Sequence, residues 1–120
     1  MKGQSPSVLV VDDDQSLRLL CRINLELDGF EVRDAGTLAD ARAAIGEARP
    51  DVVLLDVHLG GESSEALLDE LLAEGIPVLI VTGSAEVSTL RGRAGDVLVK
   101  PFMPEDLVAA ARRLVKVDAS

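Results

Sequence analysis

The stretch VLVVDDDQ, Val8 to Gln15, joins four consecutive apolar residues to three aspartates. An apolar run without polar alternation is typical of a strand that is buried on both faces of a parallel sheet. Parallel sheets bind their ligands outside the carboxyl ends of the strands, and Asp12, Asp13 and Asp14 stand at that end. The stretch therefore predicts a buried parallel strand whose tip carries acidic side chains.

Apolar runs and helical patterns alternate along the rest of the chain. Unbroken runs recur at residues 52–55 and 78–81, and shorter strand candidates lie at residues 30–33 and 97–99. Helices are expected between Asp14 and Gly29, between Thr37 and Pro50, from Ser63 or Ser64 to Gly75, from Ala85 to Arg91, and from Pro104 onward. Five units of strand and helix predict an α/β fold, a doubly wound five-stranded parallel sheet with five helices.

The first expected helix has one apolar face. Leu17, Leu20, Cys21 and Leu25 are spaced by three or four residues, so they should all turn toward the sheet. Asp14 is placed to cap the start of this helix and Gly29 to end it.

The composition is that of a single acidic domain. A chain of 120 residues can bury one hydrophobic core, which predicts one domain over residues 1–120 with a core of about 7–117. The formal net charge of −9 repels nucleic-acid phosphates and anionic membranes, so neither is expected as a direct partner. The single cysteine, Cys21, cannot form an internal disulfide, and no signal peptide or membrane-length apolar run is visible. A cytoplasmic protein is expected.

Carboxylates from two strand ends should meet. Asp56 follows the apolar run at 52–55, and if the first and third strands are adjacent it lies within a few ångströms of Asp12 and Asp13. Such carboxylates repel one another by roughly 4 kcal/mol per pair at 4 Å for an effective dielectric near 20. A hard divalent cation, Mg²⁺ or Mn²⁺, would remove this repulsion, since both prefer oxygen ligands.

Two further polar residues end strands at the same rim. Thr82 follows the run at 78–81 and offers a hydroxyl, and Lys100 follows residues 97–99 and offers a positive charge. Together with the carboxylates, these groups suit a phosphoryl-transfer site with an aspartate as the nucleophile.

Four segments in this order, VLVVDDD, DVVLLDVHLGG, VLIVTG and VLVKPF, resemble the signatures of the receiver domain of bacterial response regulators. The resemblance spans nearly the whole chain and implies a flavodoxin-like strand order of 2-1-3-4-5. It also implies a phosphoacceptor of two-component or phosphorelay signalling, without an enzymatic activity beyond Mg²⁺-dependent self-phosphorylation from a donor and autodephosphorylation. The implied partners are a sensor histidine kinase or a histidine phosphotransfer protein, and an output domain or downstream protein.

The resemblance assigns roles to individual residues. Asp56 resembles the phosphoacceptor, and Asp13 and Asp12 the acidic pair that holds the metal, Asp13 directly and Asp12 largely through water. The remaining assignments are the backbone carbonyl of His58 as a metal ligand, Thr82 as the switch hydroxyl, Lys100 as the cation that contacts the phosphoryl group, and Pro101 as the residue after a cis peptide bond.

The chain departs from the family pattern at several positions. Val97 stands where most relatives carry an aromatic switch residue, which predicts an atypical output surface. Gly60 replaces a proline and Ser64 a common glycine, which predicts a more mobile loop after Asp56. Gly83, directly after Thr82, is small enough to leave the phosphoryl group accessible.

Two alternatives remain open at this stage. The missing aromatic residue and a short span before Lys100 would suit a receiver fold that acts only in docking or dimerisation. The spacing of Asp12 and Asp14 also resembles the nucleophile motif of haloacid dehalogenase phosphatases, but the second acidic pair of that family has no counterpart at a later strand end.

Overall fold

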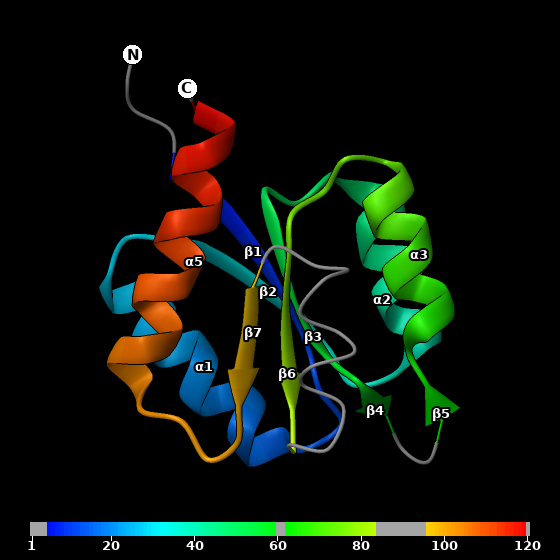
Figure 1. Cartoon of the computed structure of the whole chain (residues 1–120), viewed down its shortest axis with the longest axis horizontal. Coiled ribbons are helices and arrows are strands. Elements are labelled where there is room, and N and C mark those ends of the chain that lie inside the picture. The colour runs from blue at the N-terminus through cyan, green and yellow to red at the C-terminus, as the bar shows by residue number, and fades with distance from the viewer. Residues whose placement is uncertain (1–4, 60–61, 84–95, 120) are drawn as a thin grey trace.

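The computed structural model describes residues 5–59, 62–83 and 96–119, and its central element is a five-stranded parallel sheet (Figure 1). The strands are β1 (Ser7–Val11), β2 (Glu31–Ala35), β3 (Val52–Asp56), β6 (Val78–Thr82) and β7 (Asp96–Val99). They lie in the order β2-β1-β3-β6-β7. Counted along the chain this is the order 2-1-3-4-5, so the expected flavodoxin-like α/β sheet is confirmed.

Helices cover both faces of the sheet. They are α1 (Gln15–Leu27), α2 (Leu38–Glu47), α3 (Glu65–Ala73) and α5 (Pro104–Ala119). Figure 1 shows α1 and α5 on one face and α2 and α3 on the other. The described residues thus contain four helices instead of five, because the helix expected at Ala85–Arg91 lies outside them. None of the described helices has the length and apolarity needed to cross a membrane.

Local signals set the helix ends as the sequence predicts. The Asp14 side chain accepts hydrogen bonds from the backbone N–H groups of Ser16 and Leu17 at the start of α1. Thr37 caps α2 in the same way by accepting from the N–H of Asp40. Gly29 and Gly75, which follow α1 and α3, have φ angles of 99° and 75°, a conformation that favours glycine at helix ends.

The sheet separates two hydrophobic clusters. On the side of α2 and α3 the buried cluster includes Leu9, Leu55, Ile80, Ala41, Leu67 and Leu71. On the side of α1 and α5 it includes Val10, Leu54, Val81, Cys21, Leu25 and Leu107. Because every residue of β3 and β6 is buried, the uninterrupted apolar runs are explained by helices packed on both faces.

Two local expectations need correction. Leu20 does not share the buried face of α1, since it is 42% exposed, whereas Cys21 and Leu25 are buried. Leu20 precedes Cys21 directly, and adjacent residues of a helix point about 100° apart, so Leu20 lies at the rim of the buried face. A short antiparallel pair, β4 (His58–Leu59) and β5 (Glu62–Ser63), was also not predicted. Strands of two residues are too short to show a periodic pattern.

Candidate functional site

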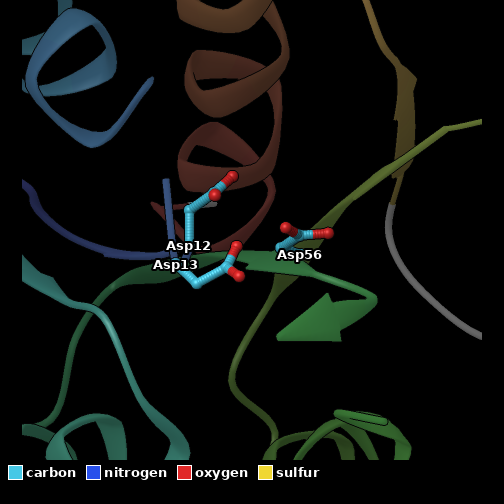
Figure 2. A group of neighbouring side chains, drawn as sticks. All are labelled: Asp12, Asp13 and Asp56. Atoms are coloured by element: carbon cyan, nitrogen blue, oxygen red, sulfur yellow. The ribbon is translucent and has the colours of Figure 1, made fainter. Parts of the chain in front are cut away.

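The carboxyl ends of β1 and β3 bring three aspartates together. Val11 of β1 pairs with Leu55 of β3, so Asp12 and Asp56, the next residues, emerge side by side. One carboxylate oxygen from each of Asp12, Asp13 and Asp56 lies within 4.8 Å of the other two. Figure 2 shows the three side chains close together at the ends of the strands. Asp12 and Asp56 are 4% and 7% exposed, whereas Asp13 is exposed to solvent. The expected convergence of acids is therefore present, with one acid at the surface and two beneath it.

Lys100 lies between the two buried carboxylates. Its Nζ atom is 3.3 Å from Oδ2 of Asp56 and 3.5 Å from Oδ2 of Asp12. Burial lowers the pKa of Lys100, but the negative charges of Asp12 and Asp56 outweigh it, and the pKa lies above its ordinary value. The ammonium group therefore stays protonated and offsets part of the repulsion between the acids.

Asp12 is held away from water by its surroundings. Burial raises the pKa of its carboxyl group, opposed by a hydrogen bond from the backbone N–H of Asp14, and the charge of Asp56 raises it further. Lys100 acts in the opposite direction, but the net shift is upward. Burial of the charged form, more than the neighbouring charges, thus makes ionised Asp12 unfavourable.

Thr82 and Lys100 are joined through their backbones. Thr82 ends β6 and is 1% exposed, and its carbonyl oxygen accepts a 2.8 Å hydrogen bond from the N–H of Lys100. Val81, the residue before it, pairs with Asp56, so Thr82 emerges one residue beyond the level of Asp56 on the next strand. The peptide bond between Lys100 and Pro101 is cis.

Two further expected residues, His58 and Gly83, follow strands of the sheet at this edge. His58 is the first residue of β4, directly beyond Val57, and Gly83 is an exposed residue after β6 with space for an added Cβ. Val97 is 7% exposed and belongs to the cluster under α2 and α3. Gly60 lies outside the described residues.

Ser64 has a role that the sequence did not indicate. It stands at the N-cap of α3, but its hydroxyl makes no side-chain capping bond. The buried hydroxyl instead contacts the carbonyl oxygens of Asp56 at 2.6 Å and of Val57 at 2.9 Å. Ser64 thus ties Asp56 and Val57 to the start of α3.

Arg18 was also missed by sequence reasoning. Its guanidinium donates a 2.8 Å hydrogen bond to the carbonyl oxygen of Asp12. A signal was available, because Arg18 lies three residues before Cys21 and seven before Leu25, at the spacing of the inward face. A charged residue at such a position has to find a partner inside the molecule.

The acidic cluster fits a hard divalent cation. Its ligands are carboxylate oxygens without sulfur or imidazole, the set that Mg²⁺ prefers. Oxygens on one octahedral Mg²⁺ at about 2.1 Å lie about 3 to 4.2 Å apart. The observed limit of 4.8 Å requires only small side-chain movements to reach that spacing.

Comparisons with known proteins agree with this geometry. The family model of the response regulator receiver domain matches residues 8–112. The DNA-binding response regulator MtrA of Mycobacterium tuberculosis is 38% identical over 110 residues, which cover 88% of this chain and 48% of that protein. The phosphate regulon transcriptional regulatory protein PhoB of Pseudomonas aeruginosa is 33% identical over 119 residues, covering 92% and 52%. The chain thus spans about half the length of the curated relatives it matches.

Solved structures show the same fold. The receiver domain of NtrX from Brucella abortus superimposes with a TM-score of 0.82 at 35% identity and covers 91% of this chain and 98% of its own. The chemotaxis response regulator CheY4 of Vibrio cholerae has a TM-score of 0.83 at 28% identity, with coverage of 92% and 99%.

Proposed function

The chain belongs to the response regulator receiver domain family, and on this premise we propose that it accepts a phosphoryl group on Asp56 in a step that depends on Mg²⁺. One observation carries the proposal. The oxygens of Asp12, Asp13 and Asp56 lie within 4.8 Å of one another, and the Lys100 ammonium is 3.3 Å from Asp56. A carboxylate nucleophile, metal-binding acids and a cation are thereby combined at one edge of the sheet. Family membership decides against the phosphatase alternative.

The proposed reaction moves one phosphoryl group between two nucleophiles. A carboxylate oxygen of Asp56 forms a bond to phosphorus while the bond from phosphorus to the donor nitrogen breaks, and the donor imidazole leaves. Attack of water on the same phosphorus reverses the modification, with Asp56 as the leaving group. The phosphoryl donor and water are the only other reactants in these two steps.

The neighbouring residues would bind and orient the group. Asp13 and Asp12 would hold Mg²⁺, together with Asp56 and the backbone carbonyl of His58, and the ion would neutralise negative charge on the phosphoryl oxygens. The Lys100 ammonium would contact one of these oxygens, and the Thr82 hydroxyl would orient another. Gly83 would leave the phosphoryl group open to water.

The proposal extends to partners. A sensor histidine kinase or a histidine phosphotransfer protein would donate the phosphoryl group, in the cytoplasm. We propose residues 7–117 as the receiver core. Since curated relatives such as MtrA are about twice as long and MtrA is named DNA-binding, an output domain or a downstream protein would read the modified state. Buried Val97 would make that output differ from an aromatic switch.

Mass spectrometry after incubation with acetyl phosphate and Mg²⁺ tests the proposal. The wild type should gain about 80 Da, one phosphoryl group, and Asp56→Asn should gain nothing. Asp69→Asn, which changes an exposed aspartate of α3, is the matched control and should be labelled like the wild type. An unlabelled wild type, or labelling that survives in Asp56→Asn, contradicts the proposal.

A direct titration with Mg²⁺ separates the docking alternative from this function. A module that only docks or dimerises has no need of the ion, so a wild type that binds no Mg²⁺ would favour that reading.

A further inference from the structure

Both backbone groups of Asp12, its N–H and its carbonyl, form hydrogen bonds with residues from other elements. Its N–H donates a 3.1 Å hydrogen bond to the carbonyl of Ala35, the last residue of β2. Beyond Ala35 the chain leaves the ladder, and the Asp12 carbonyl accepts from Nη1 of Arg18 at 2.8 Å. A side chain from α1 therefore stands where a neighbouring strand would supply the next donor.

This contact bears on Asp13 as well as on Asp12. The carbonyl of Asp12 and the nitrogen and Cα of Asp13 belong to one planar peptide unit. A hydrogen bond that fixes the carbonyl therefore also fixes the orientation of the N–Cα bond of Asp13. The N–H of Asp14 in turn donates a 2.9 Å hydrogen bond to Oδ1 of Asp12. The guanidinium of Arg18 thus holds the peptide unit from which both aspartate residues extend.

Arg18 occupies a narrow site with little freedom. Its side chain is 20% exposed, and its Nε lies 3.5 Å from Oδ2 of Asp34 on β2. This Nε atom is buried without a hydrogen bond among the described residues. A buried N–H without a hydrogen bond is unfavourable. The packing around Arg18 therefore keeps the hydrogen bond from Nη1 to Asp12 although Nε is left without one.

Gly36 makes the space that Arg18 uses. A Cβ atom added at Gly36 would lie 2.8 Å from Nη1 and 3.3 Å from Cζ of Arg18, and the third atom it would approach also belongs to Arg18. No other residue is among these nearest atoms. A methyl group at position 36 would therefore push first against the guanidinium of Arg18.

We propose that Arg18 is a positioning residue for the metal-binding acids: its guanidinium orients the peptide between Asp12 and Asp13, and Gly36 leaves the room it needs. The inference rests on the proposed function of these acids as Mg²⁺ ligands. If Arg18 acted only through its charge, its removal would have the opposite effect on Mg²⁺ binding. Since Arg18 is a cation near a cation site, its removal would tighten Mg²⁺ binding by Coulomb's law, whereas loss of a positioning contact weakens it.

Four variants and a calorimetric Mg²⁺ titration at constant ionic strength test this inference. Arg18→Met should weaken binding about tenfold, the size usual for loss of an outer partner of a metal ligand. Gly36→Ala, which keeps every charge, should weaken binding in the same direction. In the double variant, Gly36→Ala should not weaken Mg²⁺ binding beyond the effect of Arg18→Met, because the guanidinium that it displaces is already absent. Arg22→Met, one turn further along α1, is the charge-matched control and should bind as tightly as the wild type or slightly tighter.

Unchanged or tighter binding by Arg18→Met, or additive effects in the double variant, would overturn the inference. Amide hydrogen exchange in the metal-free protein supplies a second readout. The Asp14 amide should exchange faster in Arg18→Met and in Gly36→Ala than in the wild type, and equal exchange also overturns the inference. A wild type that binds no Mg²⁺ refutes the proposed function, and the exchange rates then still decide whether Arg18 orients the turn.

Discussion

Among single residues, Asp12 combines burial with a net unfavourable charge. Its pKa is raised in the folded protein, so the folded state holds the Asp12 proton more tightly than the unfolded state, in which the pKa is about 3.9. The stability contributed by this group is therefore fully present below that value and is lost as pH rises through the raised pKa.

Because the pKa of Asp12 is raised on folding, we expect Asp12→Asn to stabilise the metal-free protein at pH 7. Asparagine keeps the oxygen that accepts from Asp14 and removes the buried charge, so the free energy of unfolding should rise by on the order of 1 kcal/mol. Urea denaturation in the presence of a chelator measures it. The gain should shrink as pH falls through the raised pKa of Asp12, because the wild-type carboxyl then takes up its proton. A less stable variant would mean that the ion pair with Lys100 outweighs the cost of burial.

The residue scale also shows what sequence reasoning can reach. Asp12, Asp13 and Asp56 were predictable as neighbours because a parallel sheet brings strand ends to one edge. The spacing of Arg18 indicates only that it turns inward, and the partners of Arg18 and Ser64 were not predictable, since each is a backbone carbonyl that folding brings into reach. A sequence shows that a guanidinium or hydroxyl is present, but a carbonyl belongs to every residue and gives no signal.

At the scale of helices, glycine positions give a matched pair of tests. Gly29 ends α1 with φ of 99°, which side chains rarely adopt, although an added Cβ would meet nothing within 4 Å. Gly29→Ala should therefore destabilise the fold by about 1 kcal/mol through backbone strain alone. Gly46 lies inside α2 with equally open space and no positive φ, so Gly46→Ala should stabilise by up to about 1 kcal/mol. Chemical denaturation compares the two, and effects of equal sign would contradict this reasoning.

Strands were more predictable than helix faces. The buried runs of β1, β3 and β6 carry an unambiguous apolar signal, because both faces of each strand are covered. The face of α1 was less certain, since Leu19, Leu20, Ile23 and Leu27 are exposed beside its buried residues. Periodicity identifies an amphipathic helix, but it cannot say how far a neighbouring helix extends over the apolar surface.

For the molecule as a whole, Mg²⁺ binding should couple to stability. A ligand that binds only the folded state at a hundred times its dissociation constant adds about 2.7 kcal/mol to the free energy of unfolding. Thermal unfolding should therefore shift upward with Mg²⁺ in the wild type and much less in Asp13→Asn. Glu31→Gln, at the opposite end of the sheet, is the control, and KCl of equal ionic strength corrects for screening. An equal shift in Asp13→Asn would place the ion elsewhere.

The position of β2 at one edge of the sheet also bears on how the protein behaves when concentrated. An outer strand exposes backbone groups that another molecule could use to extend the sheet into an aggregate. Three of the five side chains of β2, Glu31, Arg33 and Asp34, are charged, and a docking strand would have to strip water from them. The charged side chains of β2 therefore oppose the addition of a further strand at this edge, and a high protein concentration does not readily lead to fibres.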